Sequence, residues 1–535
     1  MKITSSKRKI LKIAEAYFNY LGSNYPTICL SDEFYLFPRA KKALRYSNHS
    51  EDFDKDKIIQ DLKYIKNLKH ELEKVNITAL NLEERIDYAL LNQSICGFLR
   101  EFGQIKIWQN RPSLYIKIAI LGIEGLLYQE EFLKKEIGDS LILKLRKNVG
   151  LLSQLRSNVK EVSPPELELS VEIAKSASYY FRNLPLNRKY HKETSHLIRK
   201  ICQSLKEIEK LLRKLTPSKP QKEKEKILIE KTLKESFSYN KSLKEVFDLA
   251  FKEYKLTLEE IKKLSKKINK KESSFKNLLC QLSGRKNKKL NLLELYTREI
   301  EKIKNFLRKK DILDIRKGKI IVREVPLHLK PLRASASYNC WAIYNKRAPG
   351  IFYINPQEPN YQEYIFITAH EAYPGHHLLD SRRKDLKNFI RTQVESPLFY
   401  EGWASFAEEL IEETGYLKDP HQEIIGLRRR AWRATRAVLD IGLRIGKIKI
   451  SEVYSMLKDL GYPSRRLSSM IKHYLLMPGY QLCYTIGKLE FQRLKKKYSS
   501  SLGLKNFLEF ILNQGEIPFC FLEEKLKEYL CQKNS

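Results

Sequence analysis

Three of the ten histidines in the chain lie in one short stretch, His-Glu-Ala-Tyr-Pro-Gly-His-His at residues 370–377. Imidazole nitrogens and carboxylate oxygens are common zinc ligands in catalytic sites. The apolar segment 361–369 before this stretch predicts a buried helix that carries its first residues. In peptidases with His-Glu-x-x-His on a helix, the histidines bind zinc and the glutamate between them is the general base. The stretch therefore predicts a metal centre with His370 as a ligand and Glu371 as the base.

A proline stands where the second histidine of that pattern belongs. Pro374 lacks the N–H that would bond to the carbonyl of His370, and its ring clashes with that carbonyl, so a regular helix cannot continue through residues 373–375. On an undeformed helix His377 would lie roughly 10 Å along the axis from His370, too far to share an ion with it. If residues of the Tyr-Pro-Gly sequence bulge out, His376 comes one turn after His370. We therefore predict His370 and His376 as ligands and keep His377 as the alternative.

A catalytic zinc site needs a third protein ligand and keeps one position open for water. The sequence Tyr-Glu-Gly-Trp-Ala at residues 400–404 follows far enough along for the first helix to end and an antiparallel helix to return. We predict Glu401 as the third ligand, with Glu408, about two turns further on, as the weaker candidate. An ordinary helix start also favours an acid, because of the helix dipole. The combination with His-Glu and two further histidines favours the metal interpretation.

These motifs resemble those of the domain-of-unknown-function 885 family, whose hallmark is His-Glu-x-Tyr-Pro-Gly-His-His followed by Glu-Gly-Trp-Ala. Further similar segments extend the resemblance over nearly the whole chain; they span residues 84–91, 111–115, 350–355, 440–443, 474–479 and 484–487. That family is similar to zinc peptidases such as angiotensin-converting enzyme and the thimet-type oligopeptidases. The resemblance implies a mainly α, multi-helix, zincin-like (gluzincin-like) metallopeptidase fold with a Zn²⁺ cofactor and hydrolase activity on peptides.

Tyrosines near the end of the chain are candidates for stabilising a reaction intermediate. A tetrahedral oxyanion needs a hydrogen-bond donor, and a phenol is suitable. Tyr474, Tyr480 and Tyr484 flank a Pro-Gly pair at residues 478–479. We predict Tyr474 and Tyr484 as catalytic and Tyr480 as substrate-binding.

The remaining substrate-binding candidates come from the resemblance. The run 350–355 is similar to the strand that pairs with the substrate backbone in the related peptidases, which makes Tyr353 a candidate, although a structural hairpin fits the run as well. The chain departs from the family at Arg444, where His is usual, at His473, where Arg is usual, and at Tyr480, where Gln is frequent. We expect the substrate's carboxyl terminus to be held by protonated His473, Lys472 or Arg444.

Apolar residues at three- and four-residue spacing predict helices along most of the first 310 residues. The predicted helices span residues 9–21, 54–74, 81–102, 113–133, 140–159, 166–180, 192–215, 227–237, 243–264 and 292–309. β-rich runs at 319–325, 338–344 and 350–354 predict a small antiparallel sheet near the active site. The segment 216–226, rich in Pro and charge, is the best candidate linker or exposed loop. We therefore divide the chain into an amino-terminal helical lobe (1–215), a charged loop and helical region (216–310) and a metal-binding catalytic lobe (311–535).

The chain of 535 residues has a net charge of +36, which can indicate binding to nucleic acid or to an acidic membrane. The charge is spread along segments in which Lys alternates with Glu, as at residues 221–226. The densest basic run, 262–271, lacks the aromatic residues that stack on bases. We therefore expect peptide substrates and no specific nucleic acid as partners.

No apolar leader occurs in the first twenty residues, and no run of eighteen apolar residues occurs anywhere, so we expect no membrane span. The eight cysteines lack Cys-x-x-Cys spacing, which favours reduced thiols and a cytoplasmic location. The sequence thus predicts a cytoplasmic zinc-dependent peptidase of the oligopeptidase or carboxypeptidase type, with a cleft between its lobes that admits short peptides. Two alternatives remain. One is a basic helical binding protein with a structural metal site, although such a site would not need Glu371; the other is a non-haem iron enzyme, since two histidines and a carboxylate also suit iron.

Overall fold

The computed structural model describes most of the chain, and helices form the larger part of it. The described residues are 5–184, 191–219, 221–268, 275, 291–315, 318–333, 336–341, 343, 345, 347–356 and 361–534. The prediction of a mainly α protein with a small sheet is confirmed. No described helix has both the length and the apolar character that crossing a bilayer requires.

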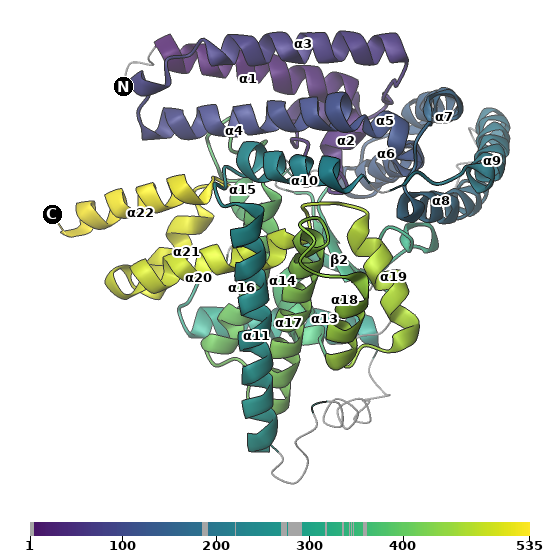
Figure 1. The fold of residues 1–535 in the computed structure, drawn as a ribbon. Coiled ribbons are helices and arrows are strands. Elements are labelled where there is room, and N and C mark those ends of the chain that lie inside the picture. The colour runs from purple at the N-terminus through teal and green to yellow at the C-terminus, as the bar shows by residue number, and fades with distance from the viewer. Residues whose placement is uncertain are drawn as a thin grey trace.

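The amino-terminal part is a set of long helices, of which α1, α3 and α4 lie side by side at the top of Figure 1. Its helices are α1 (Ser5–Asn24), α2 (Pro26–Leu30), α3 (Lys55–Glu73), α4 (Leu82–Phe98), α5 (Ile107–Asn110), α6 (Pro112–Leu133), α7 (Gly138–Asn158), α8 (Pro164–Arg182) and α9 (His191–Lys214). Local signals fix several helix starts. Asn81 and Glu84 form a reciprocal capping box at α4, and Pro112 and Pro164 occupy the first turns of α6 and α8. The helices predicted from apolar spacing are confirmed here, with ends that differ by a few residues.

Among the described residues, three further helices connect this part to the rest: α10 (Lys222–Lys231), α11 (Leu243–Ile268) and α13 (Leu292–Lys309). The predicted linker 216–226 is wrong in its second half, because α10 already begins at Lys222. Its alternating Lys and Glu side chains are largely exposed, which is the pattern of a solvated helix face.

The sheet has three strands: β1 (Ile320–Glu324), β2 (Ala336–Asn339) and β3 (Gly350–Ile354), in the order β1-β3-β2. β2 runs antiparallel to β3, but β1 runs parallel to it. The prediction of a purely antiparallel sheet is therefore wrong. The reason is topological, since β3 inserts between two strands that precede it and all five of its residues are buried. The predicted strand 338–344 ends at Asn339, and its residues 342 and 344 lie outside the described residues.

The carboxyl-terminal part contains a group of packed helices. They are α14 (Tyr364–Glu371), α15 (His376–Arg383), α16 (Pro397–Glu413), α17 (Pro420–Gly442), α18 (Ile450–Asp459), α19 (Ser464–Leu475), α20 (Leu482–Leu502), α21 (Leu504–Leu512) and α22 (Phe519–Asn534). Extensive contacts join α16 to α20 and α17 to α11. α16 and α20 approach closely because Gly402 meets Gly487, where a Cβ on either residue would overlap the backbone of the other helix.

A cavity of about 330 Å³ lies where the two sets of helices meet. One wall comes from segment 32–39, which follows α2, and from the first turns of α6. The opposite wall comes from β2, from α14 to α16 and from segment 473–484. The cavity therefore lies at the junction of amino-terminal and carboxyl-terminal helices, and the residues of the predicted metal centre are among those that line it.

Candidate metal centre

The histidine-rich stretch forms two short helices separated by a turn. α14 ends at Glu371, and Ala372 leaves the helical region with φ −111° and ψ −92°. The Tyr373–Pro374 peptide bond is cis, and α15 begins at His376. A Cβ on Gly375 would overlap the carbonyl oxygen of His370, so the turn requires glycine at this position. The helix is thus interrupted where the proline predicts an interruption.

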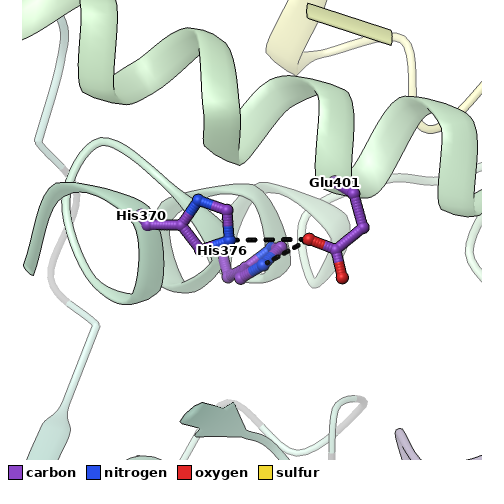
Figure 2. A group of neighbouring side chains, drawn as sticks. All are labelled: His370, His376 and Glu401. Atoms are coloured by element: carbon purple, nitrogen blue, oxygen red, sulfur yellow. Dashed lines mark ion pairs between the residues drawn. The ribbon is translucent and has the colours of Figure 1, made fainter. Parts of the chain in front are cut away.

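This interruption brings His376 beside His370 and opposite Glu401 on α16. Figure 2 shows the two imidazoles converging on one carboxylate oxygen. Nε2 of each histidine lies 3.5 Å from Oε2 of Glu401, and the three ligand atoms lie within 4.8 Å of one another. All three side chains are buried. Among the described residues, no other group of three His, Cys, Asp or Glu side chains meets this geometric test.

The spacing of these three atoms fits a shared metal ion. Metal–ligand bonds of about 2.0–2.2 Å at tetrahedral angles place two ligand atoms roughly 3.4 Å apart. A direct N–H···O hydrogen bond is shorter, at about 2.9 Å. Oε2 of Glu401 is buried and has no hydrogen-bond partner among the described residues. Two imidazole nitrogens and one carboxylate oxygen in this arrangement are a suitable donor set for Zn²⁺, with one coordination position left open.

His377, the alternative ligand, points away from the cluster. Its Nδ1 lies 3.2 Å from the hydroxyl of Tyr338, and its ring packs edge-on against Tyr373. Burial, assisted by the charge of Lys384, lowers the pKa of His377 to about 3. The structure therefore places His377 in the core behind the turn and not among the possible ligands.

Glu408, the weaker candidate for the third ligand, lies behind His370. Its Oε1 is 3.0 Å from Nδ1 of His370. Arg429 donates to both of its oxygens at 2.9 Å, and Arg433 donates to Oε2 at 2.7 Å. Although burial raises the pKa of Glu408, the charges of these two arginines hold it well below its usual range. Glu408 thus orients the ring of His370 so that Nε2 faces Glu401, as carboxylates commonly do for metal-binding histidines.

Two residues close to Glu401 in sequence contact the Tyr-Pro-Gly turn and His376. The indole N–H of Trp403 donates to the carbonyl of Pro374 at 2.9 Å, which ties α16 to the turn. The ring of Tyr400 stacks on His376, with centroids 4.0 Å apart and an angle of 16° between the ring planes. Neither side chain was among the predicted site residues, and their adjacency to Glu401 in the sequence was the available signal.

Two tyrosines bind the other oxygen of Glu401, Tyr480 just before α20 and Tyr484 in its first turn. Tyr484 donates to Oε1 at 3.0 Å, and Tyr480 donates to the same oxygen. Both line the cavity. The close approach of α16 and α20 at their glycines positions these phenols, which leaves Oε2 of Glu401 to face the histidines.

Glu371 lines the same cavity as the three ligand candidates but is not part of their cluster. Its Oε2 accepts a hydrogen bond from the backbone N–H of Tyr338 on β2 at 2.9 Å. Burial raises the pKa of Glu371 above its ordinary value. A fixed carboxylate with a raised pKa is suited to accept a proton from water.

The structure does not bring Tyr474 or Tyr353 to the cavity. The hydroxyl of Tyr474 accepts a hydrogen bond from the indole of Trp432 at 2.7 Å. Tyr353 packs under the guanidinium of Arg333, 5.4 Å from the ring centroid. β3 is the central strand and has no free edge, so it cannot pair with a substrate backbone. The strand that lines the cavity is β2.

The residues expected to hold a substrate carboxylate are also placed differently. Arg444 lies outside the cavity, where it donates to the carbonyl of Asp440 at 2.6 Å and to Glu225 at 3.0 Å. Lys472 pairs with Glu168 on the surface. His473 does line the cavity, but desolvation, followed by nearby positive charges, lowers its pKa to about 4. It is therefore neutral near pH 7 and does not supply the cation that the expected role needs.

The chain matches the family described as bacterial protein of unknown function (DUF885) over residues 39–526. It belongs to that family. No protein with curated annotation matches the chain.

Two solved structures have a similar fold. A "putative lipoprotein of unknown function" from Shewanella oneidensis has a TM-score of 0.73 at 17% identity, and the alignment covers 97% of this chain and 99% of that one. A "putative lipoprotein" from Colwellia psychrerythraea has a TM-score of 0.74 at 15% identity, over 99% of this chain and 100% of that one. Our prediction of a cytoplasmic location is contradicted by these descriptions, because a lipoprotein carries a lipid anchor. The prediction depended on leader and cysteine patterns alone, which are indirect signals of location.

Proposed function

We propose that this member of the DUF885 family is a zinc-dependent hydrolase of short peptides. The observation that supports the proposal is the buried cluster of His370, His376 and Glu401 beside Glu371, a carboxylate that lines the same cavity without belonging to the cluster. A metal site that only stabilised a fold would need neither a cavity nor an unused acid next to it.

A zinc ion held by these three side chains would lower the pKa of a bound water toward neutrality and polarise a substrate carbonyl. Glu371 is the residue that would take the proton of an attacking water. The N–H of Tyr338 occupies its Oε2, so Oε1 remains to accept that proton. The same carboxyl can then deliver the proton to the leaving amine.

Other side chains would position the ligands and the substrate. Tyr480 and Tyr484 hold Glu401, and their phenols lie at the cavity wall, where either could donate to an oxygen that becomes negative. β2 is the edge strand that lines the same cavity. The N–H of Tyr338 is bound to Glu371, and the remaining outward backbone groups of β2 could pair with an extended peptide backbone. The cavity volume of about 330 Å³ suits a few residues of a peptide and excludes a folded protein.

The test is metal analysis combined with a peptide-library digest. Protein purified without added metal is expected to contain about one equivalent of zinc and to cleave short unfolded peptides. The matched control is Glu371→Gln, which is expected to keep its zinc and lose cleavage. Iron in place of zinc would favour the oxygen-activating alternative. Zinc without cleavage of any peptide in the library would overturn the proposal.

A further inference from the structure

The cavity is acidic although the chain as a whole is strongly basic. The net charge of the chain is +36. Among the residues that line the cavity, eight are Asp or Glu and four are Lys or Arg, an excess of four carboxylates. A divalent ion in the metal centre would offset two of these four. The lining of the cavity therefore holds more carboxylates than cations, and Arg100 and Arg383, which lie outside the lining, also approach some of these carboxylates.

Two of these carboxylates lie together at the His376 end of the cavity. Asp380 follows His376 by one turn of α15, and Glu395 lies just before α16. Asp380 is only 4% exposed, its carboxylate accepts no hydrogen bond from the described residues, and its Oδ1 is fully buried. Buried carboxylates are ordinarily paired or hydrogen-bonded, because removing the charge from water costs free energy.

The neighbouring arginines do not satisfy this pair. Arg383 lies 3.8 Å from Asp380 and 3.4 Å from Glu395, but its Nη2 is bound to a third carboxylate, Glu516. Arg39 lies 3.9 Å from Glu395 and donates its Nη2 to a backbone carbonyl. Two guanidinium groups thus face three carboxylates. The distances from Asp380 and Glu395 to both arginines exceed hydrogen-bond length.

We propose that Asp380 and Glu395 form a binding site for an ammonium group of the substrate, either the free amino terminus of a short peptide or a lysine side chain. This inference rests on the proposed peptidase function for the identity of the substrate. The ammonium supplies the cation that the site lacks, and its three donors suit two carboxylates.

The site also predicts which bond of the substrate peptide is cleaved. Asp380 lies four residues after His376, about 6 Å along the helix axis, which corresponds to roughly two residues of an extended peptide. A peptide whose amino terminus is held there presents a bond close to that terminus to the metal centre. The acidic cavity disfavours a carboxylate in the same place, so cleavage is expected near the amino end and not at the carboxyl end.

The experiment measures binding separately from catalysis. Zinc-loaded Glu371→Gln protein is titrated calorimetrically with one lysine-free pentapeptide, first with a free amino terminus and then with an acetylated one. Acetylation is expected to raise Kd by at least tenfold. A third peptide, acetylated but carrying one lysine, distinguishes the two sources of the ammonium, because restored affinity would assign the site to the side chain.

Variants then test the two residues. Adding Asp380→Asn or Glu395→Gln to Glu371→Gln is expected to reduce the effect of acetylation to less than threefold, while Glu131→Gln, an exposed acid outside the cavity, leaves it unchanged. Zinc content is measured for each variant, so that loss of the metal centre is recognised. Equal Kd values for all three peptides would overturn the ammonium site. Discrimination among the peptides without cleavage by the wild-type protein would keep the site and remove the peptidase proposal.

Discussion

The two histidines of the proposed metal centre are supported in different ways. Behind His370, Glu408 accepts from two arginines and fixes the ring by charge. His376 has no such partner, and its Nδ1 is buried without a hydrogen bond among the described residues. Its ring is held instead by stacking on Tyr400 and by the Tyr-Pro-Gly turn. His370 is thus oriented by a charged hydrogen-bond partner, whereas His376 is oriented by ring stacking and by the backbone of the turn.

The difference follows from the elements that carry the two ligands. His370 belongs to α14, which packs against α16, so polar groups from α16 and α17 can reach its ring from behind. His376 is the first residue of α15, and its position depends on the four residues that separate the two helices. The first ligand is therefore sensitive to changes of charge, and the second is sensitive to changes of backbone and ring shape.

The largest effect is expected when a proposed ligand is replaced. It should be the same for both histidines, although they are supported in different ways. His370→Ala, His376→Ala and Glu401→Ala should each lose about one equivalent of zinc, because two remaining protein donors are too few. His377→Ala should bind zinc nearly normally, since its ring lies in the core. Zinc analysis after dialysis measures this. Loss of zinc from the His377 variant but not from the His376 variant would contradict the placement of both residues.

The next largest effect is expected on turnover in the variant Glu371→Gln. The amide keeps the shape of the side chain and can still face the N–H of Tyr338, so zinc content and fold should be unchanged. The loss of the general base should reduce kcat by about 10²-fold or more. The measurement is kcat for a peptide that the wild-type protein cleaves. Unchanged kcat would remove Glu371 from the mechanism.

Smaller effects on zinc affinity are expected when the groups that support the two histidines are changed. Glu408→Gln should weaken zinc binding by about 10- to 100-fold, because it removes the carboxylate that orients His370 and the carboxylate partner of Arg433, whereas Arg429 keeps Glu363. Tyr400→Leu removes only a stacked ring and should weaken zinc binding less. Competition with a chromogenic chelator gives both affinities. If Tyr400→Leu weakens zinc binding more than Glu408→Gln does, the stacked ring behind His376 contributes more to zinc affinity than the carboxylate behind His370.

The central parts of the site could be predicted because their signals are local. The proline rule places the helix break, and the break makes His376 the neighbour of His370. The position of β3 could not be predicted in the same way, because strand order depends on pairings between distant segments. The apolar character of its whole run, which indicates burial on both faces, was the available signal.

Tyr474 and Arg444 lie outside the cavity, which the sequence could not show for a related reason. A sequence shows that a phenol or a guanidinium lies near a motif, but it does not show which face of a helix points into a cavity. Tyr474 faces Trp432, and Arg444 faces Asp440 on the preceding turn. Long-range placement also explains why segment 32–39, which forms one wall of the cavity, carried no sequence signal.

The smallest expected effect compares two acids on the same helix. Glu412 follows Glu408 by one turn of α16, but burial and the charge of Glu409 raise the pKa of Glu412 to about 8, whereas the arginines keep Glu408 charged. Between the ordinary glutamate pKa of about 4.5 and pH 8, the folded protein keeps the proton of Glu412 and the unfolded chain has released it. The free energy of unfolding therefore decreases as pH rises through this interval.

Glu412→Gln removes this dependence on pH, so its Tm should match that of the wild type near pH 4.5 and exceed it by roughly 1–3 °C at pH 8. Glu413→Gln, which alters an exposed acid paired with Lys495, is the matched control. Thermal unfolding of the three proteins at both pH values measures the effect, and an equal Tm difference at pH 4.5 and pH 8 would show that Glu412 is ionised in the folded protein.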